Sequence, residues 1–538
     1  MPSRKDICLF GFGRMGQHDG AQRHVAEELE KERRASAAST VRATTADHRH
    51  ETGNLNTALQ QAVESIPSYV ERSTIMLVLV PTVKHSDRIG DVCDFRSWRG
   101  RGWCRMEFVC ALMARNDLQL IVAQGGASTP AILFPGDALF LPAGEGAFTC
   151  CARNHDFGEG PNTSPCDKRK VRAVLDAMID AKVEYLFDLG RRAEARYFAA
   201  LKHHFLRGLP PDEPSSASAS SSSGTGDAGL VALKARLRWR DDAEEAEETK
   251  RTGFGLVLLA AAADDAAAVR EALAKLAREE ERRAAANRGA ARDLPALTVQ
   301  KGQTALMFAM WFARWEVAEV LLDKGGADPE ARTTSTGIDA LMFAAFGGRA
   351  DNIVAWLRRF PEWDTERKER ISGNTAIILG VGFGPNSVGA VEALLAGGAN
   401  PAHVGDGGST LLVNAALNPD ADAALVRRLL QIPEVAQTVN TAVVPRTLKW
   451  KAVYGIARLA VRLGSKNSAL VFLAKMRQGS ALHFAAYACN VAVVRVLAEE
   501  GGADKTARTT SGLTALQLAN ENYGGRSDTP VEMSTALR

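Results

Sequence analysis

The sequence predicts a multidomain protein, with an α/β domain in its N-terminal half and an all-α solenoid of repeated helix pairs in its C-terminal half. Three observations lead to this prediction. Apolar and amphipathic segments alternate up to residue 207, a Pro- and Ser-rich stretch follows, and a helical pattern recurs from residue 252 onward. We therefore expect an α/β domain at 1–207, a linker at 208–251, repeats at 252–525 and a tail at 526–538.

The N-terminal half alternates between short apolar runs and amphipathic segments. Apolar runs bounded by proline, glycine or polar residues predict buried strands, here at 7–10, 74–81, 118–124 and 131–136. The amphipathic segments predict helices, the first beginning at Arg23 and the others at 105–115, 171–187 and 191–206. Such alternation predicts a small, mostly parallel sheet with helices on its faces.

The region between the two halves has the composition of a linker. Residues 208–229 read GLPPDEPSSASASSSSGTGDAG, which has nothing to bury in a core and predicts a flexible chain. Residues 240–251, RDDAEEAEETKR, form a charge run. We expect this run to be solvated and to lead into the repeats, so that a partial deletion would be tolerated.

The C-terminal half repeats a helix start, two helical segments and a glycine turn. Each start has a small polar residue before an apolar pair, and the side-chain oxygen of that residue suits the capping of exposed helix N–H groups. Successive starts lie 35, 36, 35, 70 and 34 residues apart, so that one step is twice the others. The turns GGADPEART, GGANPAH and GGADKTART follow second segments, where glycine ends a helix in the left-handed conformation. The expected capping residues are Thr304, Asp339, Thr375, Thr410, Ser480 and Thr514.

These features resemble the ankyrin repeat, a unit of roughly 33 residues made of a β-turn and two antiparallel helices. The chain departs from the family pattern, because His483 alone occupies the usual histidine position and the proline after the cap is missing. The resemblance implies about six or seven stacked repeats. Two segments do not fit it. Residues 279–300 predict an extra helix and loop, and residues 435–478 are either a degraded repeat or a helical insertion.

The string SWRGRGWCRMEFVCAL follows the strongest apolar run of the N-terminal half. It resembles the WCxxE segment of Toll/interleukin-receptor-like (TIR-like) domains, with Trp103, Cys104 and Glu107 at the motif positions. Some TIR domains hydrolyse NAD with a glutamate in this helix, which would correspond to Glu107, and others self-associate as adaptors. A structural role for Glu107 is favoured, because the helix start and Arg99, Arg101 and Arg105 can stabilise its charge without catalysis.

A glycine-rich motif lies near the start of the sequence, before the WCxxE segment. GFGRMG, with Gly11, Gly13 and Gly16, matches the dinucleotide-binding fingerprint of a Rossmann-like sheet. The acidic residue expected about 20 positions later has no candidate at the end of a strand. A plain glycine-rich turn is therefore favoured, and we expect no cofactor.

The remaining candidates for chemistry are favoured as structural residues. Cys150, Cys151, His155 and Cys166 have a spacing that is not recognised for zinc, so we expect buried thiols and no metal. The consecutive histidines His203 and His204, at the end of a basic segment, are expected to face solvent. No nucleophile–base–acid set with a usable motif is present in the sequence.

Composition and charge exclude several classes of function. The chain has 46% hydrophobic and 24% charged residues, which is the balance of a globular protein. Its formal net charge of +3, with no long basic block carrying aromatics, argues against a nucleic-acid partner. The longest apolar runs fall short of the ~20 residues needed to cross a bilayer, and no secretory or lipidation signal is evident. With 8 cysteines and no disulfide framework, a reducing cytoplasmic location is expected.

The sequence thus predicts an intracellular adaptor or scaffold that holds a protein partner, with a possible role in signalling. Stacked repeats offer a concave face and turn loops for such a partner, and the N-terminal domain has the option of self-association. The alternative is a TIR-like NAD hydrolase regulated by its repeats. The turn residues expected to contact a protein partner are Glu330, Arg332, His403, Thr506 and Arg508.

Overall fold

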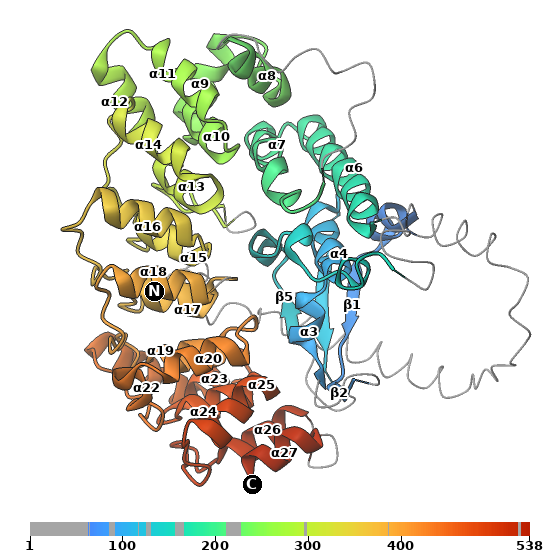
Figure 1. Ribbon diagram of the computed structural model, residues 1–538, viewed down its shortest axis with the longest axis vertical. Coiled ribbons are helices and arrows are strands. Elements are labelled where there is room, and N and C mark those ends of the chain that lie inside the picture. Colours follow the sequence, from blue (N-terminus) through green and yellow to red (C-terminus); the bar gives the residue numbers. More distant parts are fainter. Residues whose placement is uncertain are drawn as a thin grey trace, which may run out of the picture.

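The computed structural model describes residues 63, 65–85, 92–116, 118–124, 131–156, 166–210, 227–294, 298–385, 387–523, 525 and 529–538. Two parts are visible in Figure 1. The described residues up to 210 contain a small sheet and its helices, and we call them the N-terminal part. Residues 256–537 form a column of helix pairs, which we call the helical array. The strand expected at 7–10, the helix expected from Arg23 and the glycines Gly11, Gly13 and Gly16 lie outside the described residues.

The described sheet of the N-terminal part is smaller and less parallel than the sequence predicts. Strand β1 (Ile75–Leu79) pairs in parallel with β4 (Gln119–Ala123), and β4 pairs antiparallel with β5 (Ala131–Leu133). The strands predicted at 74–81 and 118–124 are confirmed. The run at 131–136 is a strand for three residues only, because Pro135 then begins the 3₁₀-helix η1 (Pro135–Phe140). A two-stranded antiparallel ladder joins β2 (Val83–Lys84) to β3 (Val92–Cys93).

Helices pack against one another beside this sheet. The predicted helices are confirmed as α4 (Gly102–Met113), α6 (Asp167–Asp188) and α7 (Arg192–Phe205), with α4 packed on α6 and α6 on α7. Their contact surfaces are apolar and fully buried, as at Phe108, Leu175 and Ile179. Shorter elements complete this part: α3 (Phe95–Gly100), η2 (Ala143–Glu145) and α5 (Thr149–Ala152).

The region expected as a linker is folded in its second half. Helices α8 (Asp227–Leu237) and α9 (Asp242–Thr252) occupy it. Most residues of the charge run are exposed, as expected, but the run forms a helix and Glu248 is buried. Helix α9 is held against α7 by ion pairs between Arg196 and two glutamates of the charge run. Arg196 of α7 is fully buried and pairs with Glu248 and, at 3.1 Å, with Glu244. These glutamates are four residues apart and so share one face of α9, which makes the acidic run an anchor.

We expect the stability of the chain to depend on pH through Glu244. Burial acts to raise the pKa of this carboxyl, but hydrogen bonds from Arg240 and Arg196 outweigh it and lower the pKa from 4.5 to about 2. Because the folded pKa is depressed, the stabilisation is complete above pH 4.5 and is lost as the pH falls toward 2. Unfolding free energies should show that Glu244→Gln destabilises the chain above pH 4.5 and that this difference shrinks in acid. The exposed Glu247→Gln is the control, and an equal pH dependence in both variants would refute the assignment.

The first helix of each pair in the array begins where the sequence predicts. Thr304, Asp339, Thr375, Thr410 and Ser480 are the N-cap residues of five helices, and Thr514 precedes a sixth. Asp339 Oδ1 accepts from Met342 N at 3.0 Å, which is the expected capping contact. The first helices are α10 (Leu256–Ala262), α13 (Ala305–Phe312), α15 (Ala340–Phe346), α17 (Ala376–Phe383), α19 (Leu411–Leu417), α24 (Ala481–Tyr487) and α26 (Ala515–Tyr523).

The second helices follow in turn, and α14, α16 and α18 lie on the side of their first helices that faces away from the N-terminal part (Figure 1). They are α11 (Ala266–Ala274), α14 (Trp315–Asp323), α16 (Ala350–Arg359), α18 (Ser387–Ala396), α20 (Ala423–Leu430), α25 (Val491–Arg495), which is extended by η4 (Val496–Glu500), and α27 (Val531–Leu537). The last of these occupies the segment expected as a tail. It is not a tail, because Met533, Ala536 and Leu537 are buried against α25 and α26.

The packing of the first helices decides the nature of the two irregular segments. Each first helix contacts the next one, and α19 packs directly on α24. Residues 435–478 are therefore a helical insertion, made of α22 (Leu448–Arg462) and α23 (Ser468–Met476), which pack on each other. A short helix, α21 (Pro433–Ala436), precedes them. The segment at 279–300 contains the expected extra helix as α12 (Glu279–Asn287).

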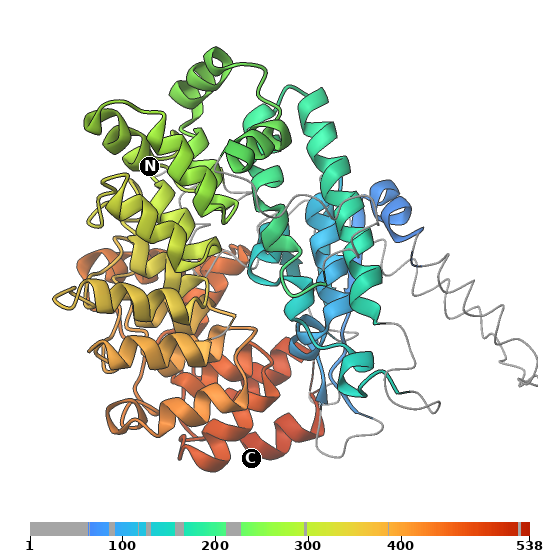
Figure 2. The same ribbon diagram turned by 45° about the horizontal axis from the view of Figure 1, so that its top comes forward.

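The array curves around the N-terminal part in both views (Figures 1 and 2). Aromatic rings on first helices form much of the contact. Phe140 packs against Trp311 and Phe346, with ring centroids 5.5 and 4.8 Å apart. Tyr197 of α7 packs against Phe308 at 6.0 Å. The concave face expected to bind a partner is thus in contact with the same chain.

Polar contacts extend this interface along the array. Arg99 donates two hydrogen bonds to the carboxylate of Asp420, both 2.7 Å long. Thr82 and Tyr523 are joined by a hydroxyl–hydroxyl bond of 3.1 Å. His204 was expected in solvent, but it is buried, its ring meets that of Phe312 edge to face, and Nε2 donates to a backbone carbonyl at 2.7 Å. Burial holds the pKa of His204 well below its usual range.

The helices of the described residues bear on whether the chain could cross a membrane. Among them, none combines the length and the apolar character that crossing a bilayer requires.

Candidate protein-binding surface

The turns that join each second helix to the next first helix form one edge of the array. We call residues 325–338, 360–374 and 397–409 the turn edge. Backbone hydrogen bonds link successive turns, from Thr334 N to Lys301 O (2.8 Å), from Arg370 N to Thr336 O (2.7 Å) and from Asp406 N to Ser372 O (2.7 Å). The turn edge points away from the N-terminal part (Figure 1). It is therefore a continuous, braced surface on the side of the array opposite the intramolecular contact.

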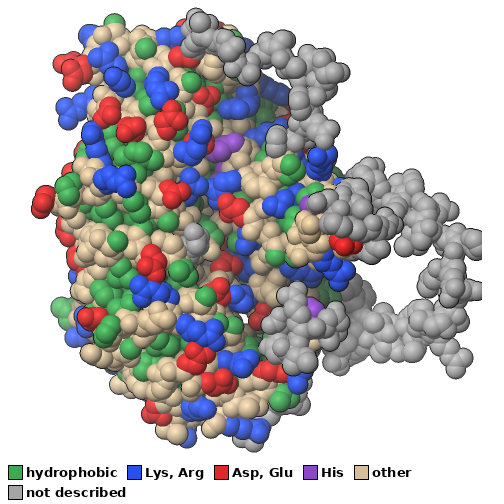
Figure 3. Space-filling model, viewed as in Figure 1, with side chains coloured by type: hydrophobic (Ala, Val, Ile, Leu, Met, Phe, Trp, Pro, Cys, Tyr) green, Lys and Arg blue, Asp and Glu red, His purple; other side chains and the backbone are tan. Residues whose placement is uncertain are grey.

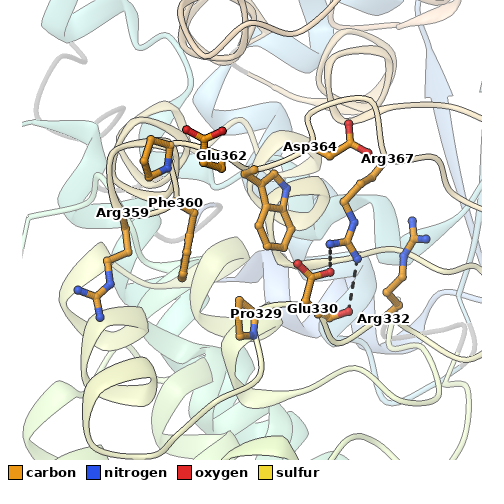
Figure 4. A pocket seen from close by; sticks show the side chains of 10 residues that line it. Pro329, Glu330, Arg332, Arg359, Phe360, Glu362, Asp364 and Arg367 are labelled. Carbon is orange, nitrogen blue, oxygen red and sulfur yellow. Dashed lines mark hydrogen bonds and ion pairs between the residues drawn. The ribbon is translucent and has the colours of Figure 1, made fainter.

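A hollow of about 730 Å³ opens between the first two turns of this edge (Figure 4). Glu330 and Arg332, both predicted as contact residues, line it together with Arg367 on one side. Arg359 and Phe360 lie on the other side, with Pro329 between (Figure 4). The complete lining is Pro329, Glu330, Arg332, Arg359, Phe360, Pro361, Glu362, Trp363, Asp364 and Arg367.

The charges around the hollow are held in fixed positions. Arg367 pairs with Glu330 and, at 3.2 Å, with the buried carboxylate of Asp339, and its guanidinium lies 4.6 Å from the Trp363 ring centroid. Burial raises the pKa of Asp339, although Arg367 and Arg332 oppose the effect. Burial is also the main cause that lowers the pKa of Arg332. A network of charges of alternating sign therefore lies on one side of the hollow.

Aromatic residues that the sequence analysis missed support this network. Trp356 of α16 is fully buried, and its ring contacts those of Phe360 at 4.8 Å and Trp363 at 5.0 Å. The signal was present in the sequence, because the turn after α16 carries FPEW before its charged residues. Tryptophan is enriched among the residues that contribute most to protein–protein binding, so Trp363 is a candidate contact residue.

The other predicted contact residues do not line the hollow. His403 is not a surface contact, since it is buried and bridges two turns, with Nε2 donating to Gly373 O at 2.9 Å and Nδ1 3.2 Å from Glu366. Thr506 and Arg508 are exposed in the turn that precedes α26. Arg508 donates to Gly512 O at 2.7 Å within that turn. His403 is therefore a positioning residue, and Glu330 and Arg332 are the pair that the structure brings together.

Helix α22 of the insertion adds an apolar face beside the turn edge. Leu448, Ile456, Leu459 and Leu463 are 84, 63, 58 and 79% exposed. Their spacing puts them within one stripe of the helix, since each residue turns by about 100°. On its opposite side Trp450 is buried and donates from Nε1 to Ile371 O at 3.0 Å, which fixes α22 against the turn edge.

Basic residues flank the apolar stripe of α22. Lys451, Arg458 and Arg462 lie along one of its borders at helical spacing, and Lys449 lies at the other. No aspartate or glutamate occurs in the sequence between Glu434 and Glu499. Exposed apolar residues bordered by charge of one sign are typical of an interaction surface. We call this stripe and its basic border the α22 face.

The α22 face contrasts with the rest of the visible surface. Figure 3 shows acidic and basic side chains interspersed over the face of the array that it presents, with apolar groups between them. Such mixing gives no extended field of one sign. Helix α22, which carries basic residues and no acidic ones, therefore distinguishes its face from a surface of mixed charge.

The geometry around Glu107 differs from the expected arrangement. Burial raises the pKa of Glu107, and Arg101 is the cation that opposes this. The expected pairing with Arg99 and Arg105 is wrong, because Arg99 binds Asp420 and Arg105 donates to Arg99 O at 2.7 Å. Nothing in the described part of the chain supports NAD hydrolysis there. The TIR-like resemblance and a catalytic Glu107 stay predictions, as do the glycines outside the described residues.

A second cluster lies in the N-terminal part. Cys150, Cys151, His155 and Cys166, for which the sequence predicts no metal, have all their ligand atoms within 4.8 Å of one another. Burial and the neighbouring thiols raise the pKa of Cys151 to about 11. The spacing in the chain gave no sign of this convergence, because it depends on how the end of α5 meets the start of α6.

Comparison with known proteins identifies one segment. A family model described as ankyrin repeat matches residues 301–334, which contain α13, α14 and the start of the turn edge. No curated protein matches the sequence. Among solved structures, a chain from a predatory endopeptidase of Bdellovibrio bacteriovorus in complex with an immunity protein is 24% identical, over 43% of this chain and 95% of that chain. Its TM-score of 0.28 is too low to establish a shared fold.

Proposed function

Because residues 301–334 are an ankyrin repeat, we propose that the chain is an adaptor that binds a protein partner through the turn edge and the α22 face. Repeats of this kind support protein–protein interaction in general, and stacking them into a solenoid extends the surface available. The observation that carries the proposal is the position of this repeat in the array. Its turn forms one wall of the hollow, on the side away from the N-terminal part.

The intramolecular contact supports this choice of surface. Phe308, Trp311 and Phe346, on first helices of the array, already pack against the N-terminal part. A partner on that side would have to displace these aromatic contacts and the buried Arg99–Asp420 pair. A partner that binds the turn edge would displace none of these contacts, since the two parts of the chain stay packed on each other.

The chemistry of the α22 face defines the kind of partner. Four exposed apolar side chains in one stripe fit the apolar side of a helix laid along them. The lysines and arginines beside the stripe fit carboxylates on the border of that helix, which would fix its orientation. We therefore propose an acidic amphipathic segment of another protein as the occupant, with the hollow taking further side chains of the same partner.

The test is site-specific cross-linking in the full chain. A photo-reactive amino acid in place of Leu459 should capture one acidic protein reproducibly from an extract, and mass spectrometry would identify it and its cross-linked segment. Binding of the purified partner should then fall by about thirtyfold or more for Leu459→Glu with Leu463→Glu, the loss of about 2 kcal/mol that defines an interface hot spot.

The matched control places the same charge on another exposed apolar position. Val231 of α8 is 63% exposed, and Val231→Glu should leave the affinity unchanged. A cross-linked segment without acidic residues, equal losses in both variants, or capture by anionic vesicles instead of a protein would contradict the proposal.

The remaining parts of the function follow from the same proposal. Protein binding of this kind needs no cofactor, and we propose that it takes place in the cytoplasm, where the seven free cysteines of the described residues would stay reduced. A role in signalling and self-association through the N-terminal part stay predictions.

A further inference from the structure

Four metal-binding side chains meet between α5 and α6. Cys150 and Cys151 belong to α5, His155 follows that helix, and Cys166 immediately precedes α6. The Sγ atoms of Cys150 and Cys151 are 3.9 Å apart, and those of Cys151 and Cys166 are 3.8 Å apart. Together with His155 they keep all ligand atoms within 4.8 Å.

These distances match a tetrahedral zinc site. Zinc–sulfur bonds of about 2.3 Å place two thiolates on one Zn²⁺ about 3.8 Å apart. A disulfide is less well matched, because its sulfur atoms are bonded at about 2.05 Å. We propose that Cys150, Cys151, His155 and Cys166 hold one Zn²⁺ ion in a Cys₃His site.

The histidine supplies a second, independent observation. Nε2 of His155 is buried and has no hydrogen-bond partner among the described residues. A buried ring nitrogen without a partner is costly, and a metal ion would satisfy it. The chain turns His155 back toward the thiols through left-handed conformations at Asn154 and His155, with φ of 49° and 55°. His155 N also donates to Cys150 O at 2.7 Å, which closes this turn.

The surroundings suit a cluster of thiolates. Three thiolates, a neutral imidazole and Zn²⁺ carry one net negative charge. Cys166 is the N-cap residue of α6, a helix of 22 residues, where the aligned peptide dipoles favour negative charge. Asp167, the next residue, accepts from Trp103 Nε1 at 3.2 Å and so holds the start of α6 against α4.

The role of the ion is structural. Four protein ligands leave no open position, which is the difference between structural and catalytic zinc sites. The ion would join α5 to α6 and thereby fix Phe148, the residue before α5. The Phe148 ring fills the space of a missing side chain at Gly102, 2.0 Å from where a Cβ would lie. Zinc would thus secure the amino end of α4, which begins at Gly102.

The experiment uses the full chain, reduced and freed of metal with a chelator. Titration with Co²⁺ should give one equivalent of binding, with the visible bands of a tetrahedral site and a thiolate charge-transfer band, and Zn²⁺ should displace it. His155→Ala, Cys151→Ser and Cys166→Ser each remove a direct ligand. We expect their affinity to fall by more than the ~10- to 100-fold that loss of an outer-shell partner costs.

Cys93→Ser is the matched control, since Cys93 is a half-buried thiol outside the cluster, and it should bind one equivalent with unchanged affinity. Competition of the wild-type chain with a chromophoric chelator measures the site without any substitution, so variants that misfold do not decide the matter. The proposal is overturned if reduced wild-type chain takes up no stoichiometric metal, if Cys93→Ser loses binding equally, or if the thiols form a Cys151–Cys166 disulfide and the reduced chain binds no Co²⁺.

Discussion

Arg99→Ala is expected to destabilise the full chain by about 3–5 kcal/mol, the cost of breaking a buried ion pair. Arg99 is 1% exposed and donates two hydrogen bonds to Asp420, whose side chain is 10% exposed. Burial alone would lower the pKa of Arg99, but the charge and hydrogen bonds of Asp420 raise it. Removal of the guanidinium would leave the Asp420 carboxylate almost buried without its partner. Chemical denaturation monitored by circular dichroism measures the loss.

A neighbouring pair provides the control for this prediction. Arg96 lies 3.7 Å from Asp422, and both side chains are partly exposed. Arg96→Ala should therefore cost about 0.2–1 kcal/mol, as for surface ion pairs. The double replacement Arg99→Met with Asp420→Leu should recover most of the stability, because it removes both charges at once. Equal effects of Arg99→Ala and Arg96→Ala would show that the buried pair does not join the two parts.

Trp311→Ala is expected to cost about 3–5 kcal/mol, the range for deleting a large buried aromatic side chain. Trp311 stacks on Phe312 at 4.4 Å and on Phe343 at 5.4 Å within the array, and it contacts Phe140 of the N-terminal part at 5.5 Å. The substitution therefore opens a cavity in the array and removes a contact with the N-terminal part. Thermal and urea unfolding of the full chain measure the effect.

The exposed Tyr69→Ala should change stability by less than about 0.5 kcal/mol and serves as the control. A double-mutant cycle of Trp311→Ala with Phe140→Ala separates the two contributions of Trp311. We expect a coupling of about 0.5–1.5 kcal/mol, as for aromatic pairs in contact. Strict additivity would mean that Phe140 and Trp311 do not meet across the interface.

Local signals in the sequence predicted much of the array. The caps at Asp339 and Thr410 place a side-chain oxygen at a helix start, and this chemistry needs no distant partner. The strands at 74–81 and 118–124 are continuous apolar runs, which are equally local. The insertion at 435–478 was left open, because its helices have the same composition as a repeat. Only the direct packing of α19 on α24 distinguishes the two.

The features that the sequence did not predict depend on distant residues. The acidic run at 240–251 becomes a packed helix because Arg196 lies buried beneath it. His204 leaves solvent because Phe312, far along the chain, covers it. In the proposed binding surface, the turn pattern predicted Glu330 and Arg332, whereas it did not predict Trp363 or the α22 face. The apolar stripe of α22 is exposed because Trp450, on the opposite side of the helix, packs against the turn edge and bonds to Ile371 O. The sequence does not show which side of the helix makes this contact.

The bond between Thr82 and Tyr523 joins residues that are 441 positions apart. A linear row of repeats folds through contacts between neighbours, and such local contacts form quickly. Here the last helix pair also closes onto a strand region near the other end, and the loop entropy of that closure opposes its early formation. On the ribosome, the strand region around Thr82 would lack this contact until α26 emerges. Chaperone demand during synthesis should therefore persist until α26 has emerged.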